Sequence, residues 1–192
     1  MKLAIFGYGG MAREIQQHMK EDVTFFVDDK YTNEKTKPIS EFDPKIYKII
    51  IGISDCNDRK KIVESLPDTT EYFSFVHPTA IIMDDNVKVG EGSFIGAYSI
   101  LTTNIELGKH SILNRSCQIG HDTNIGDFLS MMPGSIISGN CKIGNNVYIG
   151  SNSSVREKIT ICDNVIIGLN GGVVKNITKE GVYVGLPVKK IK

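Results

Sequence analysis

The chain has 192 residues, with 22 basic and 22 acidic side chains, so its formal net charge at pH 7 is zero. This balance leaves no electrostatic footprint for a nucleic acid or for an anionic membrane surface. The N-terminus offers only the apolar run Leu3–Phe6, far too short for a signal-peptide core, and no stretch approaches the roughly 20 apolar residues that span a bilayer. We expect a soluble, cytoplasmic protein with no nucleic-acid partner and no membrane span.

Residues 1–76 alternate short apolar runs with helical patterns, which indicates a small α/β domain. Strands are predicted over residues 2–6, 23–27, 49–51 and 72–76. Helices are predicted over residues 11–19 and 59–66, with Ser54 or Asp55 as the cap of the second. Strands that alternate with helices imply a parallel sheet, here a single βαβαβ half of a Rossmann-like fold.

A glycine-rich turn at residues 7–12 follows the first strand and reads G-x-G-x-x-A. Asp28 and Asp29 end the second strand about 20 residues later, which completes the fingerprint of a dinucleotide site. Gly52 ends the third strand and would line the same crevice. The alternative is an ordinary tight turn between a strand and a helix. Because about 76 residues supply only one mononucleotide half, a nucleotide joined to something other than a second nucleotide fits better than NAD.

Residues 77–192 follow a different pattern, in which an apolar residue recurs every six residues. The recurring positions are Met83, Val89, Ile95, Leu101, Leu107, Leu113, Ile119, Ile125, Met131, Ile137, Ile143, Ile149, Val155, Ile161, Ile167 and Val173. Glycine directly follows half of them, which suits corners where the chain turns sharply or adopts positive φ. A small or apolar residue follows at the fourth position. Three hexads make a triangular coil of 18 residues, so residues 83–178 form about five coils of a parallel β-solenoid, with a C-terminal extension over 175–191.

The unbroken phase of the repeat has a consequence for any active site on the solenoid. An unbroken repeat leaves no room for a protruding loop, so a neighbouring subunit or the N-terminal domain must cover such a site. A prism with a bare flat face also exposes a large apolar surface, which favours self-association. We expect a homotrimer.

His121 and Asp122 stand out at a corner of the solenoid. His121 comes two residues after Ile119 and just past Gly120, so its side chain should project outward. An adjacent carboxylate can orient an imidazole ring and raise its basicity, which suits a general base. The alternative is an ordinary surface histidine.

The sequence carries no motif for a metal or a disulfide. His110 and His121 are 11 residues apart rather than 18, so they do not converge from adjacent coils, and we expect no metal. The four cysteines include no C-x-x-C pair. Cys117 and Cys141 fall on the small inward position of the repeat, which favours reduced thiols that pack as small hydrophobic groups over a cysteine nucleophile.

The repeat resembles that of the left-handed β-helix (hexapeptide-repeat) acyltransferases. The division into two domains, residues 1–76 and 77–192, is similar to that of bacterial nucleotide-amino-sugar N-acetyltransferases and of sialic acid O-acetyltransferases. The matching segments are Gly7-Tyr-Gly-Gly-Met11, Val27-Asp-Asp29, Ile51-Gly-Ile53, Asn57-Asp-Arg59, His77-Pro-Thr-Ala80, Gly120-His-Asp122, Gly139-Asn-Cys-Lys-Ile-Gly144 and Val184-Gly-Leu-Pro187. The left-handed coil is implied by this resemblance, because ordinary parallel crossovers are right-handed. The resemblance also implies an acetyl-coenzyme A-dependent N-acetyltransferase for surface glycan or glycoprotein biosynthesis. Its substrate would be a nucleotide-linked amino-sugar, with a UDP-4-amino-4,6-dideoxy sugar chosen on resemblance alone.

The family's functional residues map onto specific positions of this chain. By resemblance His121 is the general base that takes a proton as the sugar amine attacks the thioester, and Asp122 raises its basicity. The nucleotide-sugar would contact Gly9, Gly10, Met11, Asp28, Asp29 and Gly52. Acetyl-coenzyme A would lie between subunits, along Ser130, Gly139, Ser151 and Leu169, with the Gly139 N–H as a candidate oxyanion donor. The chain departs from the family at Ser130, where a second histidine is common, and at Asp122, where several members have glutamate.

Two other functions remain open at this stage. Within enzymes, the alternative is O-acetylation of a sugar. From a different class, a non-catalytic scaffold that binds a nucleotide-sugar would share the same two domains. The Gly120–Asp122 segment favours catalysis, because a solenoid that only binds nucleotide has no use for a histidine–carboxylate pair.

Overall fold

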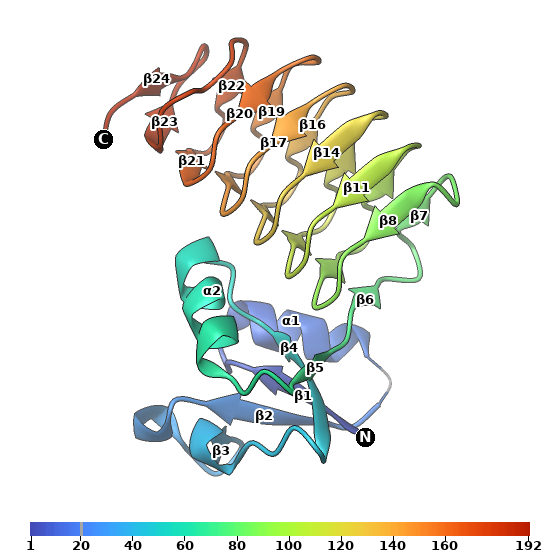
Figure 1. Ribbon diagram of the computed structural model, residues 1–192, viewed down its shortest axis with the longest axis vertical. Coiled ribbons are helices and arrows are strands. Elements are labelled where there is room, and N and C mark those ends of the chain that lie inside the picture. The colour runs from blue at the N-terminus through green and yellow to red at the C-terminus, as the bar shows by residue number, and fades with distance from the viewer. Residues whose placement is uncertain (20) are drawn as a thin grey trace. The chain divides into compact units, whose positions relative to one another are not determined.

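A computed structural model describes residues 1–19 and 21–192, which form two compact units, Met1–Ser74 and Phe75–Lys192 (Figure 1). Within the described part of the chain, no helix is both long and apolar enough to cross a membrane. Each unit has its own core, and the two are described in turn.

The N-terminal unit is built on a five-stranded parallel sheet. Its strands are β1 (Lys2–Phe6), β2 (Val23–Val27), β3 (Lys37–Pro38), β4 (Tyr47–Ile51) and β5 (Glu71–Tyr72), in the spatial order β3-β2-β1-β4-β5. This confirms the predicted parallel sheet, and the order reverses between β1 and β4, as in a Rossmann half. The prediction omitted β3, because a two-residue edge strand that ends in proline has no apolar run to reveal it.

Two helices and two short 3-10 turns connect these strands. They are α1 (Gly10–His18), η1 (Asp29–Tyr31), η2 (Ile39–Glu41) and α2 (Cys56–Ser65). α1 buries Ala12 and Ile15 against the sheet. α2 begins three residues before the predicted start, because the carboxylate of Asp55 accepts a hydrogen bond from the Asp58 N–H at 2.9 Å and caps it there. Of the two predicted caps, Asp55 is the one observed.

The strand predicted over residues 72–76 is two strands in different sheets, so that prediction was wrong. β5 pairs with β4, whereas β6 (Phe75–Val76) pairs with β9 (Phe94–Ile95) of the second unit. The chain leaves one sheet and enters another within two residues. The segment Tyr72-Phe-Ser-Phe-Val76 is rich in aromatic residues that suit a strand in either sheet, so it does not mark the change.

The second unit is a three-sided parallel solenoid whose faces are stacks of short strands (Figure 1). Face 1 contains β7 (Ile81–Ile82), β10 (Ile100–Leu101), β13 (Gln118–Ile119), β16 (Ile136–Ile137), β19 (Ser154–Val155) and β22 (Gly172–Val173). Face 2 contains β8 (Val87–Val89), β11 (Ile105–Leu107), β14 (Thr123–Ile125), β17 (Lys142–Ile143) and β20 (Thr160–Ile161). Face 3 contains β6, β9, β12 (Ile112–Leu113), β15 (Ser130–Met131), β18 (Tyr148–Ile149), β21 (Val165–Ile167), β23 (Gly181–Val184) and β24 (Lys189–Lys190). Along most of the stack each residue pairs with one 18 positions later, as in Leu101 with Ile119, which confirms the predicted coil.

The inside of the solenoid is filled as the repeat predicts, except at its start. Leu101, Ile119 and Ile137 are at most 1% exposed and form part of one continuous core. Met83, however, is 65% exposed, and Ile82 pairs with Leu101 in its place. The corner between β7 and β8 holds one more residue than later corners, so the phase is set only from β8 onward. The inward prediction for Met83 was wrong for this reason.

The small inward residues are buried and bonded between coils. The Ser99 hydroxyl donates to the Asn114 carbonyl at 2.9 Å and accepts from the Cys117 N–H at 3.2 Å. Such bonds remove the cost of burying a hydroxyl. Cys117 and Cys141 are buried as free thiols, and burial raises the pKa of the Cys117 thiol to about 11. These two cysteines therefore serve packing, because a thiol so rarely ionised is a poor nucleophile.

The corners of the solenoid use a left-handed backbone at every sixth residue. These residues are Gly92, Tyr98, Asn104, His110, Ser116, Asp122, Phe128, Gly134, Asn140, Asn146, Asn152, Lys158, Asn164 and Asn170. The glycines that follow the apolar positions were expected at corners where the chain turns sharply or adopts positive φ, and the second of these alternatives was wrong, because none of them has positive φ. They are needed for stacking instead: a Cβ on Gly120 would lie 2.5 Å from the Gly139 nitrogen of the next coil. The positive φ falls two residues later, where Asn and Asp tolerate it better than most side chains.

Candidate active site

His121 and Asp122 form the corner between β13 on face 1 and β14 on face 2. The Nδ1 atom of His121 lies 2.7 Å from Oδ2 of Asp122. The two side chains are 55% and 48% exposed, so the pair can meet a substrate. Asp122 has a φ of 56°, one of the left-handed corner positions, and this turn brings its carboxylate back beside the ring of the preceding residue.

The charge of Asp122 determines which ring nitrogen of His121 can act as a base. The Nδ2 atom of Asn104, one coil earlier, donates to Oδ1 of Asp122 at 2.7 Å. This bond is the largest cause that lowers the pKa of the Asp122 carboxyl, followed by the bond with His121, so the carboxyl is ionised at neutral pH. An ionised carboxylate only accepts hydrogen bonds. The neutral ring therefore carries its proton on Nδ1 and keeps a lone pair on Nε2.

Gly139 lies one coil above His121, at the same corner. A Cβ built on Gly139 would lie 2.7 Å from Nε2 and 2.8 Å from Cε1 of His121. Any other residue here would push against the nitrogen that carries the lone pair. The absence of a side chain at this position therefore leaves room for the ring.

Backbone hydrogen bonds to the coils on both sides hold this corner in place. The Asp122 N–H donates to the Thr103 carbonyl at 3.1 Å, and the Asn140 N–H donates to the His121 carbonyl at 2.7 Å. The Thr123 hydroxyl donates to that same carbonyl at 3.2 Å. Such a backbone presents the ring from a fixed position, which general acid–base chemistry requires.

The four residues predicted to contact acetyl-coenzyme A do not gather in one chain. Gly139 shares the His121 corner between faces 1 and 2. Ser151 and Leu169 stack one above the other at the corner between faces 3 and 1, where Leu169 is 71% exposed. Ser130 lies on β15 of face 3 and is fully buried. A ligand that touches both corners must therefore reach across face 1 or involve a second chain.

The residues predicted to hold the nucleotide do gather at one edge of the N-terminal sheet. Gly9 and Gly10 follow β1 and lead into α1 with Met11, Asp28 and Asp29 follow β2, and Gly52 follows β4. Because β2, β1 and β4 are adjacent and parallel, these residues all lie at the carboxyl ends of their strands. Open α/β sheets bind their ligands at this edge.

The contacts of these residues differ: some lie beside open space, and others pack or bond within the N-terminal unit. A Cβ on Gly9 or Gly10 would meet nothing within 4 Å, so the space above this turn is open. A Cβ on Gly52 would lie 2.8 Å from Ala12, so this glycine lets α1 pack closely on the sheet. The Asp29 carboxylate accepts from the Ser40 N–H at 3.1 Å, and hydrogen bonds from Ser40 lower its pKa. The Asp29 carboxylate therefore stabilises the turn to which it belongs.

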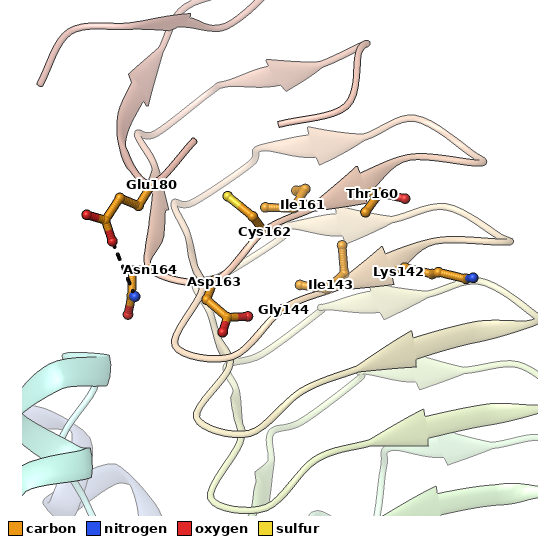
Figure 2. A pocket seen from close by; sticks show the side chains of 9 residues that line it. All are labelled: Lys142, Ile143, Gly144, Thr160, Ile161, Cys162, Asp163, Asn164 and Glu180. Carbon is orange, nitrogen blue, oxygen red and sulfur yellow. Dashed lines mark hydrogen bonds between the residues drawn. The ribbon is translucent and has the colours of Figure 1, made fainter. Parts of the chain in front are cut away.

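A separate depression of about 520 Å³ lies beside β17 and β20, at the corner between faces 2 and 3 (Figure 2). None of the predicted site residues lines it. Its polar groups bond to neighbouring residues: Asp163 accepts from the Asn145 N–H at 2.8 Å, and Asn164 donates to Glu180 at 3.4 Å. Among residues 1–19 and 21–192, no three His, Cys, Asp or Glu side chains are grouped so that they could hold a metal ion.

Sequence reasoning missed Asn104. The available signal was its spacing of 18 residues from Asp122, which places the two side chains at the same corner one coil apart.

Comparison with known proteins agrees with this organisation. Residues 2–66 match the PglD N-terminal domain family, and residues 116–156 and 140–168 match the bacterial transferase hexapeptide family. The chain therefore carries a PglD-type N-terminal domain and a run of bacterial transferase hexapeptide repeats. A GDP-perosamine N-acetyltransferase from Escherichia coli O157:H7 is 26% identical over 149 residues, which are 68% of this chain and 67% of that protein.

One further relative and one solved structure are informative. An acyl-[acyl-carrier-protein]–UDP-N-acetylglucosamine O-acyltransferase from Rickettsia canadensis is 32% identical over 122 residues, but the alignment spans only 58% of this chain and 45% of that enzyme. A histidine-to-alanine variant of the GDP-perosamine N-acetyltransferase from Caulobacter crescentus, solved with CoA and GDP-perosamine, superimposes with a TM-score of 0.90 at 20% identity, covering 100% of this chain and 97% of the other. The shared fold confirms the predicted α/β domain followed by a left-handed β-helix.

Proposed function

We propose that this transferase moves the acetyl group of acetyl-coenzyme A to the amino group of a nucleotide-linked amino-sugar. The observation that carries the proposal is the His121–Asp122 pair, with Nδ1 held by a carboxylate at 2.7 Å and Nε2 beside a residue that has no side chain. The relatives that share the fold along the whole chain support it, because the bound molecules of the Caulobacter enzyme are CoA and GDP-perosamine.

The chemistry follows from the position of the base. The sugar amine attacks the thioester carbonyl, and Nε2 of His121 takes the proton that the nitrogen loses as the C–N bond forms. The tetrahedral intermediate then collapses, the C–S bond breaks, and coenzyme A leaves as a thiolate that takes the proton from the His121 imidazolium, which restores the neutral base. Asp122 stabilises the imidazolium that forms in between. The Gly139 N–H is the proposed donor to the oxyanion.

The nucleotide is proposed to bind at the carboxyl edge of the N-terminal sheet. Its phosphates would lie at the start of α1, above Gly9, Gly10 and Met11, where a helix N-terminus favours negative charge. Asp28 would accept a hydrogen bond from a sugar or ribose hydroxyl. Gly52 shapes the floor of this crevice through its contact with Ala12.

Acetyl-coenzyme A is proposed to lie between two chains of a homotrimer. The support is the separation of Gly139 from Ser151 and Leu169, which occupy different corners of the same prism. A threefold arrangement would bring one corner of each chain to the other corner of its neighbour. Sedimentation analysis should then give about three times the 21.2 kDa of one chain.

Because acetyl-coenzyme A is made inside the cell, the proposed reaction takes place in the cytoplasm.

The test is release of the coenzyme A thiol with a matched panel of acceptors. UDP-, dTDP- and GDP-linked 4-amino-4,6-dideoxy sugars, including GDP-perosamine, are compared with their 4-hydroxy counterparts. Release with an amino-sugar and not with its hydroxy counterpart supports the proposal. No release with any member, together with nucleotide-sugar binding, would favour a scaffold and contradict it.

Sugar O-acetylation is the second candidate. The observation that favours it is the 32% identity to an O-acyltransferase of a UDP-sugar, which exceeds the identity to the N-acetyltransferases named above. That alignment leaves more than a third of this chain uncovered. Thiol release with the hydroxy-sugars alone would establish this candidate.

A further inference from the structure

The carboxylate of Asp122 is held by two different side chains, one on each oxygen. Oδ2 meets Nδ1 of His121 at 2.7 Å, and Oδ1 meets Nδ2 of Asn104 at 2.7 Å. Asn104 comes from the coil before, at the corner between β10 and β11. The three side chains therefore form a line that runs from Asn104 through Asp122 to His121.

The direction of the Asn104 bond is fixed by the chemistry of its partner. An ionised carboxylate has no hydrogen to donate, so the amide must present its NH₂ group to Oδ1. The last torsion of an aspartate is broad and roughly two-fold, so one partner alone leaves the carboxylate free to turn. A second donor on the opposite oxygen restricts that rotation.

The backbone delivers the amide to this place. Asn104 and Asp122 have φ values of 51° and 56°, so both occupy the left-handed corner position of successive coils. The Asp122 N–H donates to the carbonyl of Thr103, the residue before Asn104, at 3.1 Å. The two corners are thus in register, and their side chains meet without a change of backbone.

We propose that Asn104 is a positioning residue for the His121–Asp122 pair. Its amide holds the Asp122 carboxylate in the rotation that keeps Oδ2 on Nδ1, and thereby keeps Nε2 of His121 directed at the substrate amine. This inference rests on the proposed function, because it assigns Asn104 a part in activating the proposed base. The bond from Asn104 also lowers the pKa of Asp122, which keeps the carboxylate in the form that accepts the ring proton.

A matched control exists in another corner of the same solenoid. Asn146 donates to Oδ1 of Asn164 at 2.8 Å, and Asn164 has a φ of 57°. Replacing Asn164 removes an amide–amide contact between coils, together with the bond from Asn164 to Glu180, at a left-handed residue away from His121. Glycine is the right replacement at both positions, because it accepts positive φ without strain and leaves only the loss of the side chain.

The experiment compares Asn104→Gly with Asn164→Gly in steady-state kinetics, with acetyl-coenzyme A and the panel sugar that the wild-type chain acetylates. A hydrogen bond to a charged group corresponds to about ten-fold or more in a rate. We expect kcat to fall about ten-fold in Asn104→Gly with KM unchanged for both substrates, and to stay at the wild-type value in Asn164→Gly. Equal kcat values for the two variants would overturn the inference.

A second experiment uses the Asn104 amide to hold a side chain in the unproductive orientation. In Asp122→Asn, the Asn104 NH₂ group attracts the oxygen of the new amide and turns its NH₂ group toward Nδ1, which forces the ring proton onto Nε2 and removes the base. Adding Asn104→Gly frees the new amide to flip, so the double variant should be more active than Asp122→Asn alone. A purely structural role predicts the reverse, a further loss in the double variant, and that result would reject the positioning role.

His121→Ala, assayed in parallel, separates this inference from the proposed function. Wild-type turnover in His121→Ala overturns both, because no base is then left to position. A deep loss in His121→Ala with normal kcat in Asn104→Gly overturns the role of Asn104 alone.

Asn104→Asp, which places a second carboxylate against Asp122, should lose more activity than Asn104→Gly because the like charges repel.

Discussion

The corner that carries His121 and the carboxyl edge of the N-terminal sheet both gather chemically useful side chains, but they hold them differently. At the corner, backbone bonds tie each residue to the coil above or below, as Asn140 is tied to His121 at 2.7 Å. At the sheet edge, Gly9 and Asp28 belong to turns at the ends of separate strands, and the space above Gly9 is open. The corner is therefore suited to chemistry and the edge to binding. Changes at the corner should alter kcat, whereas changes at the edge should alter KM.

The largest effect is expected from His121→Ala. A positioned general base contributes about 10²–10⁴-fold, so kcat should fall by that amount. Because the side chain is half exposed and outside the core, the melting temperature and the oligomeric state should stay as in the wild type. Thiol release and a thermal melt measure the two properties. A hydroxyl needs the base more than an amine does, so a loss near the upper limit would point toward O-acetylation.

Gly139→Ala tests the corner from the other side. The added Cβ would lie 2.7 Å from Nε2 of His121. Because the His121 ring is exposed, it can turn away from this Cβ, so the variant should displace the base without destabilising the fold. We expect kcat to fall about 10²-fold, the lower limit for loss of a general base, with little change in the melting temperature. Glu157→Ala, at the same corner one coil further on and exposed, is the control and should keep full activity. Wild-type kcat in Gly139→Ala would mean that Nε2 is not the base.

Asp28→Asn and Asp29→Asn test the sheet edge. If Asp28 accepts a ligand hydroxyl, its neutral variant should raise the KM for the nucleotide-sugar about ten-fold, the value of a hydrogen bond to a charged group, with kcat and the KM for acetyl-coenzyme A unchanged. Asp29 already accepts from Ser40, so Asp29→Asn should change the KM much less. Reversed results would exchange the roles of the two residues. A fall in kcat alone in either variant would break the distinction between edge and corner.

The difference between the regular solenoid and the N-terminal sheet also explains what could be predicted from the sequence. A six-residue period places every side chain of the solenoid inside, outside or at a corner, so the outward histidine and the buried Cys117 follow from counting. Counting fails where the number of residues per corner changes, as it does before β8, and this is why Met83 was placed inside. Counting also places Asn104 one coil from Asp122 but does not show whether the two side chains bond, so Asn104 was missed. In the N-terminal unit the strand order depends on long-range pairing, so the alternation of strands and helices predicted a parallel sheet but not its order β3-β2-β1-β4-β5.

The smallest expected effect concerns the titration of two aspartates, one in each region. Hydrogen bonds lower the pKa of both Asp122 and Asp29 from the ordinary value of 3.8. At Asp122 the largest cause is a side-chain amide, which Asn104→Gly removes. At Asp29 the causes are the side chain and the backbone N–H of Ser40, and Ser40→Ala removes only the first. Carbon-13 NMR of the carboxyl groups should therefore show a pKa that rises part of the way toward 3.8 in each variant, because His121 still bonds to Asp122 and the Ser40 N–H still bonds to Asp29.

The sign of the stability change follows from these directions. A carboxyl whose folded pKa is lowered stabilises the fold above its unfolded value of 3.8, and that contribution is lost as the pH falls through the folded pKa. Both variants should thus match the wild type in acid, below the lowered pKa values, and be slightly less stable than it above pH 3.8. Because both carboxylates are exposed to solvent, salt should shrink these differences. A pKa of Asp122 that does not move in Asn104→Gly would show that the amide does not hold the carboxylate in solution, and the corner would then be no more ordered than the edge.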